Sequence, residues 1–384
     1  MLTLKDLSSE IDNARLASVN FALPKEFPSY DNISRLSIND KSLSFNDKRD
    51  LNSQLNQASD NQPTLFFKST GISIHDVNEK NISIEVTQKE VGTNNGLVSL
   101  INDLACDYRI KISCHESSQP LVLWLIYDLD LKDQLTGYEI DINVASGTQL
   151  TLKEFITNTS ESKGILNRRY NLFLGSKCFV EHTQIATLSN TMDSLLEFNV
   201  HQLSHSKMML KSFDAGNRIS YKTLNIDLAE SSSEFEFEGL IHTSEKEVSQ
   251  QFVYVHHGAS DTSSKQNHRI LSAGESKGKF HSTIHTDKDI KNINAHQLSK
   301  NLLLSKEANI MTYPILEINT DDIQCSHGAT IGMLNPEHIL YLRSRGIPEE
   351  DALGILIEGM TNEFFNMDNF HLERGIIDPW INRS

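Results

Sequence analysis

A cysteine and a histidine stand two positions apart near the end of the chain, within the segment Asp321–Gly332. If this segment is a strand, the side-chain period of two points Cys325 and His327 to the same face, with Cα atoms about 7 Å apart. A thiolate beside an imidazole suits iron, zinc or copper(I), and both groups are ligands of iron–sulfur centres. Because a cluster or a tetrahedral metal usually needs about four ligands, the others would have to come from another chain.

The same pair also has a purely structural interpretation. A free cysteine often behaves as a small buried apolar residue. His327 would then be a turn residue in front of Gly328.

Histidines offer a second kind of site, because neutral imidazole is a common ligand of zinc, copper and iron. The chain has 15 of them. This count supports an alternative hypothesis, a metal-dependent lyase or hydrolase with the histidine cluster at its centre, although no tight triad with a carboxylate stands out. The histidines that crowd the region rich in predicted strands are His201, His205, His242, His256, His257, His268, His281 and His285.

The segment Gly274–Phe280 resembles a phosphate-binding loop but does not fit one. Three residues rather than four separate its glycines, and Phe280 stands where a hydroxyl must reach magnesium. The sequence also lacks the H-E-x-x-H pattern of zinc proteases. We therefore expect a chain that is not itself an enzyme, and any ATP that acts with it is hydrolysed elsewhere.

Charge argues against two classes of partner. Lys and Arg number 35 against 51 for Asp and Glu, a net charge of −16. Such a field repels nucleic acid and anionic membrane surfaces, whose binding relies on basic residues. The longest apolar run, Leu121–Tyr127, is far short of the roughly 20 residues of a membrane-spanning helix. We expect neither nucleic acid nor membrane as a partner.

The N-terminal residues and the cysteines indicate the compartment. Met1–Leu7 mixes acid and base among its apolar residues, unlike a signal peptide. The four cysteines form no C-x-x-C pair and no regular spacing, so neither a disulfide framework nor a self-contained zinc site is expected. A reducing cytoplasm fits best.

The elements that position these residues fall into three regions. Residues 1–65 are polar and suggest an N-terminal helical or loosely ordered region, residues 66–334 a β core, and residues 335–384 a C-terminal helical region. Short alternating segments of the core begin near Leu196, Met208, Tyr221, Phe235 and Phe252. Such even spacing occurs in sandwiches, barrels and solenoids.

Turn chemistry favours the solenoid. Tight antiparallel hairpins prefer Asn-Gly or Asp-Gly, and the one such dipeptide, Asn95-Gly96, lies outside the repetitive region. Two segments per coil give coils of roughly 25–30 residues, within the range of repeat folds. We therefore predict a mainly β protein with a parallel β-helix core, and keep an antiparallel sandwich as the alternative.

Two amphipathic helices are predicted after the core. Asn335-Pro336-Glu337 is typical of a helix start, Gly346 of its end, and Pro348-Glu349-Glu350 of a second start. The apolar face of the second helix either covers the open end of the solenoid or docks a partner. That face consists of Leu353, Leu356, Ile357, Met360 and Phe364.

At these segments the chain resembles the SufD branch of the SufB/SufD family, which belongs to the SUF iron–sulfur cluster assembly system. The resemblance spans roughly residues 250–365, and the SufB branch differs where this chain has His327–Thr330. The N-terminal quarter departs from the family, because the tryptophan expected near Leu23–Glu26 is absent. The matching segments are Asn301–Ser305, Pro314–Ile318, Asp321–Gly332 and Tyr341–Ile347.

The resemblance implies a right-handed parallel β-helix flanked by helical regions. It implies pairing with SufB, and docking of the ATPase SufC on the C-terminal helices. Cys325 and His327 would face SufB and share a transient iron–sulfur cluster with it, without a tightly bound cofactor. A chain built for a pseudo-symmetric heterodimer can also form a homodimer when its partner is absent. The residues expected to bind partners are Tyr341, Arg343, Arg345, Gly346, Leu353, Leu356, Ile357 and Met360.

Overall fold

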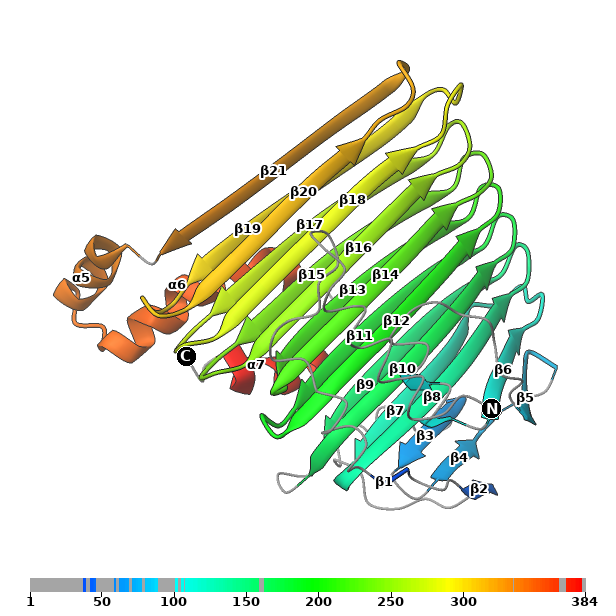
Figure 1. Cartoon of the computed structure of the whole chain (residues 1–384), viewed down its shortest axis with the longest axis horizontal. Helices are drawn as coiled ribbons and strands as arrows, with labels where there is room; N and C mark the ends of the chain where they lie inside the picture. Colours follow the sequence, from blue (N-terminus) through cyan, green and yellow to red (C-terminus); the bar gives the residue numbers. More distant parts are fainter. Residues whose placement is uncertain are drawn as a thin grey trace.

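The protein consists of two parallel sheets wound into one coil, followed by helices (Figure 1). The structure is a computed structural model. It describes residues 37–38, 42–45, 59, 62–68, 71–77, 80–88, 101–102, 105–106, 108–158, 162–333, 335–365 and 371–381. Most of the N-terminal region, for which a helical or loosely ordered structure was predicted, lies outside these residues.

The first sheet, sheet A, has the strand order β20-β18-β16-β14-β12-β10-β8-β6-β5, with β1 paired to β8. Its strands are β1 (Ser37–Ile38), β5 (Ile82–Gln88), β6 (Tyr108–Cys114), β8 (Lys132–Val144), β10 (Lys163–Leu174), β12 (Met192–Gln202), β14 (Ile219–Leu228), β16 (Val248–His257), β18 (Lys277–Thr286) and β20 (Asn309–Glu317).

The second sheet, sheet B, has the order β2-β4-β3-β7-β9-β11-β13-β15-β17-β19-β21. Its strands are β2 (Ser42–Phe45), β3 (Thr64–Lys68), β4 (Gly71–His75), β7 (Leu121–Leu129), β9 (Gln149–Asn158), β11 (Phe179–Leu188), β13 (Lys207–Gly216), β15 (Glu234–Thr243), β17 (Ser263–Ser272), β19 (Ile293–Leu303) and β21 (Ile323–Met333).

From β7 to β21 the chain crosses from one sheet to the other after every strand, and each strand pairs in parallel with the strand one coil later. Tyr221 pairs with Gln250, and Gln250 with Lys279, so one coil takes about 29 residues. The predicted parallel β-solenoid is therefore confirmed. Its right-handed sense stays a prediction. Among the described strands, the antiparallel pairs β3–β4 and β5–β6 lie at the N-terminal end of the coil.

The main hydrophobic core fills the space between the sheets. Inward positions of successive strands stack in rows, because a strand turns alternate side chains to one face and the parallel register repeats that face in each coil. Each fully buried Leu, Ile or Phe contributes about 1.5–3 kcal/mol relative to exposure. Examples from neighbouring coils are Leu172, Val180, Phe198, Leu210 and Phe237.

A charged network lies inside this core, at the level of β9, β10 and β11. The Glu154 carboxylate accepts hydrogen bonds from Arg168 at 2.7 Å, Tyr170 at 2.7 Å and Gln184 at 2.7 Å, and lies 3.1 Å from His182 Nε2. All five side chains are buried. Burial raises the pKa of Glu154, but Arg168 and the hydrogen bonds outweigh burial and lower it to about 2. The carboxylate is therefore charged and fully bonded in the interior.

Five successive turns from sheet A to sheet B share one backbone feature. The residue two positions before each of β9, β11, β13, β15 and β17 is left-handed, with φ of 74° at Gly147, 59° at Lys177 and 57° at His205. Its amide donates to a carbonyl in the next turn: Gly147 N lies 2.9 Å from Ser176 O, and Lys177 N lies 2.9 Å from Ser204 O. The turns thus stack on one another as the strands do.

In the described residues, three helices follow the last strand: α5 (Pro336–Ser344), α6 (Glu349–Phe365) and α7 (His371–Ile381). The predicted helix start is confirmed, because the Asn335 side chain accepts from the Glu337 amide at 2.9 Å and Pro336 opens α5. None of the helices in the described part of the chain is long and apolar enough to cross a membrane.

Helices α6 and α7 pack on the outer side of sheet B, where a second apolar cluster lies. In that cluster Ile357 of α6 and Ile377 of α7 join Leu240 and Phe213 of the sheet. Glu373 of α7, which is buried, forms a 3.0 Å ion pair with Lys153 of β9. These helices therefore cover the flank of sheet B and leave the end of the coil open.

Candidate functional site

Strand β21 carries the predicted donor pair and is the outermost strand of sheet B (Figure 1). Cys325 and His327 lie within this strand, and both are exposed. The predicted strand with both side chains on one face is therefore confirmed. The alternative, a buried apolar cysteine followed by a turn histidine, is wrong.

The register shows to which side the pair projects. Cys325 pairs with Ala295 of β19, and His327 pairs with Gln297. Directly opposite residues point to the same face of a sheet. Ala295 is 0% exposed and Gln297 3% exposed, so this face is the inner one. Cys325 and His327 thus occupy core positions of the coil, but at its last turn, where no further described coil covers them.

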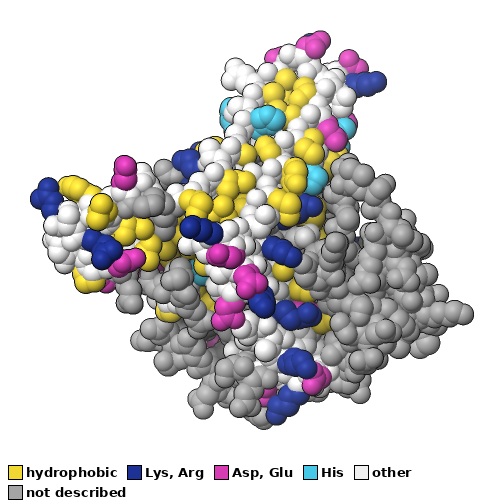
Figure 2. Space-filling view, turned by 60° about the vertical axis from the view of Figure 1, so that its left-hand side comes forward, with side chains coloured by type: hydrophobic (Ala, Val, Ile, Leu, Met, Phe, Trp, Pro, Cys, Tyr) yellow, Lys and Arg dark blue, Asp and Glu magenta, His cyan; other side chains and the backbone are white. Residues whose placement is uncertain are grey.

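Two apolar side chains lie on the same face as the pair at this open end. Ile331 and Met333 share the face of Cys325 on β21, and they are 46% and 53% exposed. Figure 2 shows exposed hydrophobic side chains between polar ones on the projecting upper part of the molecule. Core positions of this kind are unfavourable in water and are suited to burial against another protein.

Cys325 differs from the other three cysteines, which are free but buried. Burial raises the pKa of the Cys114 thiol to about 12 and that of Cys178 to about 12, so both stay protonated and unreactive. Cys325 is the exposed cysteine and hence the thiol that an incoming metal ion can reach.

The residues predicted to bind a partner divide into exposed and packed ones. Tyr341 is 58% exposed, and the guanidinium of Arg345 lies 5.3 Å from its ring centroid. Arg343 is exposed and forms a 3.0 Å ion pair with Glu349. Gly346, exposed and left-handed with φ of 83°, ends the turn after α5.

On α6 the predicted apolar face lies partly within the protein itself. Ile357 is 3% exposed and belongs to the cluster on sheet B, while Leu353 and Leu356 are half-buried. The side chain of Met360 lies outside the described residues. Among the predicted partner residues whose side chains are described, the most exposed ones therefore lie on α5 and its following turn.

The histidines of the strand region do not form one cluster. His242, His257 and His268 are buried inside the fold, and His281 is nearly so. His205 is an exposed turn residue. His201, His256 and His285 lie on the outer face of sheet A, in register with one another and with carboxylates. Sequence spacing alone did not reveal this alignment, because it appears only when the coil length is known.

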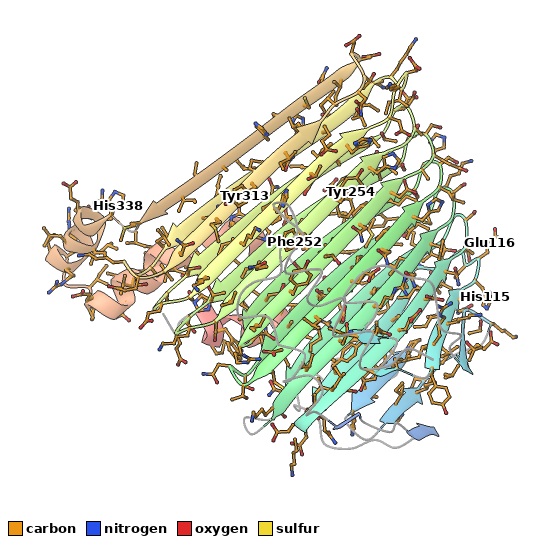
Figure 3. The ribbon with its side chains drawn as sticks, viewed as in Figure 1. His115, Glu116, Phe252, Tyr254, Tyr313 and His338 are labelled. Atoms are coloured by element: carbon orange, nitrogen blue, oxygen red, sulfur yellow. The ribbon has the colours of Figure 1, made fainter. Side chains whose placement is uncertain are left out.

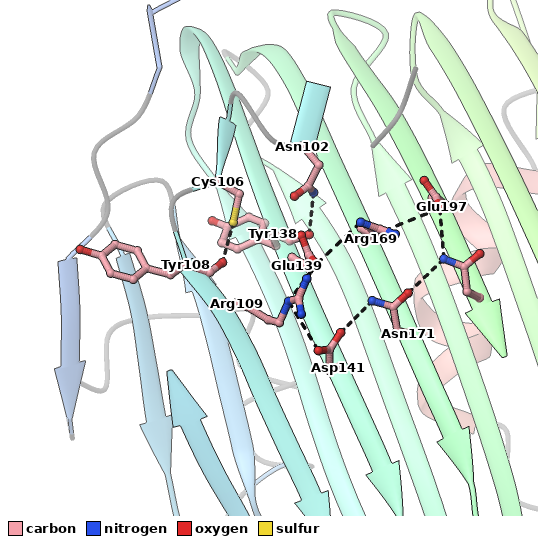
Figure 4. Close-up of polar contacts among 11 residues, drawn as sticks. Asn102, Cys106, Tyr108, Arg109, Tyr138, Glu139, Asp141, Arg169, Asn171 and Glu197 are labelled. Carbon is pink, nitrogen blue, oxygen red and sulfur yellow. Dashed lines mark hydrogen bonds and ion pairs between the residues drawn. The ribbon is translucent and has the colours of Figure 1, made fainter. Parts of the chain in front are cut away.

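That outer face carries further polar rows. Arg109, Glu139, Arg169 and Glu197 alternate in charge across β6, β8, β10 and β12, with an Arg109–Glu139 contact of 2.6 Å (Figure 4). A second row, one carboxylate and three amides on β8, β10, β12 and β14, is joined by hydrogen bonds of 2.7–3.0 Å: Asp141, Asn171, Asn199 and Asn225. Each such contact between strands contributes about 0.2–1 kcal/mol, and together they favour one register.

The segment Gly274–Phe280 consists of a turn and the start of β18. It also contains the G-x-S-x-G spacing of a nucleophile elbow, with Ser276 at its centre. Ser276 is 0% exposed, and its hydroxyl lies 3.0 Å from that of Thr243. A buried hydroxyl in a turn between two strands cannot attack a substrate, so the segment is structural.

The fold and the exposed pair define a parallel β-solenoid that presents a cysteine and a histidine on the inner face of its last strand. Residues 130–360 match the family model described as the SufBD core domain of SUF-system FeS cluster assembly. This match covers more than half of the chain, and the chain belongs to the SufB/SufD family.

Several relatives carry the names of this family. The chain is 25% identical to the iron-sulfur cluster assembly protein SufD of Escherichia coli over 59% of its own length and 53% of the relative. It is 29% identical to a SufBD family protein of Synechocystis over 65% and 57%, and 41% identical to SufD of Bacillus subtilis over 19% and 17%. The chain thus matches little more than half the length of the first two. The predicted resemblance to the SufD branch is confirmed.

Proposed function

We propose that this chain is a non-catalytic scaffold subunit of iron–sulfur cluster assembly. It pairs with SufB through the β-solenoid and binds the ATPase SufC through its C-terminal helices. Cys325 and His327 supply one side of a transient cluster between the two solenoids, and no cofactor is tightly bound. Family membership supports the assembly role over the alternative of a metal-dependent lyase or hydrolase.

The observation that carries this proposal is an incomplete ligand set in an uncovered core position. Among the described residues, no third His, Cys, Asp or Glu joins Cys325 and His327 in a compact donor group. Iron–sulfur clusters need about four protein ligands. Because the pair faces the open end of the coil, a second solenoid that covers this end would bring the missing ligands.

The test is reconstitution of the complex with SufB, SufC, iron and a sulfide source. We expect His327→Ala to lower the yield of cluster, measured by its visible absorption, by at least about tenfold, because one ligand of about four is lost. Cys325→Ser should lower the yield less. The complex should still elute as one species in size-exclusion chromatography.

His296→Ala is the matched control for the His327 variant. His296 is an exposed histidine on the neighbouring strand β19, bonded to Ser326, and it projects to the outer face instead of the inner one. Its replacement should leave the cluster yield unchanged. A normal yield from His327→Ala in an intact complex contradicts the ligand role.

If SufC docks on α5, some substitutions should abolish SufC binding without changing the stability of the chain. The double change Tyr341→Glu and Arg343→Glu places new charge on the exposed α5 surface, so SufC should be lost in a pull-down while the thermal transition stays in place. Ile357→Asp buries a charge against sheet B and should lower the transition instead. Retention of SufC by the α5 variant would place docking elsewhere.

The compartment forms part of the same proposal. All four cysteines are free, which supports the reducing cytoplasm that the sequence predicts. One relative, 35% identical over 26% of the chain, is the chloroplastic protein ABCI7 of Arabidopsis thaliana. Membership of the family therefore does not fix the compartment.

A further inference from the structure

A row of histidines and carboxylates runs across the outer face of sheet A, away from the Cys325–His327 pair. Asp227 of β14 pairs in register with His256 of β16, His256 with His285 of β18, and His285 with Glu317 of β20. Asp287 follows β18 directly. Each coil thus contributes one titratable group at the same height of the solenoid.

Within this row the two histidines are oriented by carboxylates on their outer sides. His256 Nδ1 lies 2.9 Å from Asp227 Oδ1, and His285 Nδ1 lies 3.1 Å from Glu317 Oε2. An ionised carboxylate only accepts hydrogen bonds, so each Nδ1 carries the proton. In a neutral ring Nε2 then carries the lone pair and is available to a metal ion, whereas in a protonated His256 it donates to Asp287.

Both Nε2 atoms face one carboxylate oxygen. Asp287 Oδ1 lies 3.2 Å from Nε2 of His256 and 3.9 Å from Nε2 of His285. Two lone pairs and a negative oxygen repel one another unless a cation lies between them. A proton on Nε2 of His256 satisfies Asp287 but leaves Nε2 of His285 3.9 Å from that carboxylate, whereas a metal ion between them uses all three donors.

We propose that His256, His285 and Asp287 bind a divalent first-row transition metal ion such as Zn²⁺ or Co²⁺. In the part of the chain that the structure describes, they form the one group of three such donors whose ligand atoms lie within 4.8 Å of one another. Donors around a tetrahedral ion at about 2.0–2.1 Å stand about 3.4 Å apart, so small side-chain rotations complete the site. Mixed imidazole and carboxylate donors favour transition metals over Mg²⁺.

The carboxylates that accept hydrogen bonds from the two Nδ1 atoms orient the histidine rings. A metal-binding histidine usually donates its other N–H to a carboxylate, which fixes the ring and strengthens the ligand. Asp227 and Glu317 stand in that relation here before any ion binds. The ring of Tyr254, which is labelled in Figure 3, stacks beside that of His285 with the centroids 6.1 Å apart.

The site is open to solvent. The side chains of His256 and His285 are 29% and 28% exposed, and Asp287 is 50% exposed. A surface groove of about 320 Å³, lined in part by His201, Asp227 and His256, borders it. Three protein donors leave at least one coordination position for water, so the ion is exchangeable and lies between two successive coils.

The experiment is a Co²⁺ titration of the full chain carrying Cys325→Ser and His327→Ala, which removes the donor pair on β21. One saturable ion per chain, with the visible absorption of Co²⁺ bound to nitrogen and oxygen, is the expected result. His285→Ala should weaken binding by at least tenfold, and Asp227→Asn and Glu317→Gln by about 10–100-fold. Zn²⁺ should displace Co²⁺, and excess Mg²⁺ should not.

His296→Ala, which removes an exposed histidine on the other sheet, should leave the titration unchanged. Circular dichroism of each variant checks the fold, and the rise of the thermal midpoint with Zn²⁺ should disappear in His285→Ala. Absence of saturable binding, or equal binding by the His256→Ala, His285→Ala and unsubstituted chains, overturns the proposal. The outcome is independent of cluster assembly, because the β21 donors are absent from every sample.

Discussion

Single buried histidines link the stability of this fold to pH. His268 is 1% exposed and stacks on Phe280, with ring centroids 3.8 Å apart and planes within 7°. Burial, followed by the charges of Arg269 and Lys222, lowers the pKa of His268 to about 3. Burial likewise lowers the pKa of His257, which contacts Thr262 and Ser264, to about 4.

We expect the free energy of unfolding to fall as the pH drops below about 6.5. In the folded state His268 stays neutral down to about pH 3, whereas in the unfolded chain it takes up a proton near its usual pKa. The unfolded state therefore binds more protons, and each such histidine costs about 1.4 kcal/mol per pH unit.

The variant His268→Phe isolates this effect, because it keeps a ring on Phe280 and removes the titrating group. Urea unfolding of both proteins between about pH 7 and about pH 5 should show a shallower pH dependence in the variant, by roughly one proton. Asp193, whose pKa burial raises to about 6, titrates in both proteins and cancels. Equal slopes would mean that His268 is charged in the folded state.

At the residue scale the sequence predicted only what is local. The spacing of Cys325 and His327 placed both on one face of a strand, and their position at the last turn made them exposed. The group of His256, His285 and Asp287 was missed, because its members lie about one coil apart and only the register joins them.

Two glycines allow the effect of backbone conformation on stability to be compared between a turn and a helix. Gly147 holds the left-handed position of its turn, with φ of 74°, and Gly354 lies inside α6. An added Cβ would meet no atom within 4 Å at either position. Substitution by alanine therefore tests backbone conformation alone, without a packing change.

We expect opposite signs for the two substitutions. Gly147→Ala should lower the free energy of unfolding by about 1 kcal/mol, because left-handed alanine costs about 1–2 kcal/mol and the stiffer unfolded chain returns part of this. Gly354→Ala should raise it by about 0.5–1 kcal/mol, because glycine weakens a helix interior. Chemical denaturation measures both free energies of unfolding. A decrease in both variants would contradict the expected difference between the left-handed turn and the helix.

At the scale of strands, helices and turns, the hydrophobic pattern and the helix-start residues predicted part of the structure. The alternating segments and the Asn335-Pro336 start were visible in the sequence and are confirmed. The sequence indicated these turns only through its lack of hairpin dipeptides, because residue types such as Lys177 and Ser232 do not signal a left-handed backbone. A hydrogen bond to the next turn supports each of them, and such contacts between coils cannot be read from a single turn.

The molecule as a whole ends in an unfinished coil. Its last inner face presents Ile331 and Met333 beside the donor pair, while Thr330 of the same strand faces outwards. The family resemblance, and not periodicity, predicted that another solenoid covers this end. The packing of α6 and α7 on the flank of sheet B leaves the end accessible.

Charge at this end should prevent pairing. Ile331→Asp with Met333→Asp should weaken association with SufB by at least about tenfold, because two buried apolar contacts become desolvated charges. The same change should abolish any homodimer of the isolated chain. Analytical ultracentrifugation measures both, and Thr330→Asp serves as the control on the opposite face. Undiminished association of the double variant would move the interface away from the open end.

The constant register has a genetic consequence. Because Tyr221, Gln250 and Lys279 occupy the same place in successive coils, a deletion or duplication of one whole coil rejoins the chain with every side chain still facing its proper side. Loss of one amino acid within a strand instead turns inner residues outwards for the rest of that strand. Natural variation in the length of such chains is therefore expected to occur in steps of about 29 residues or within the turns.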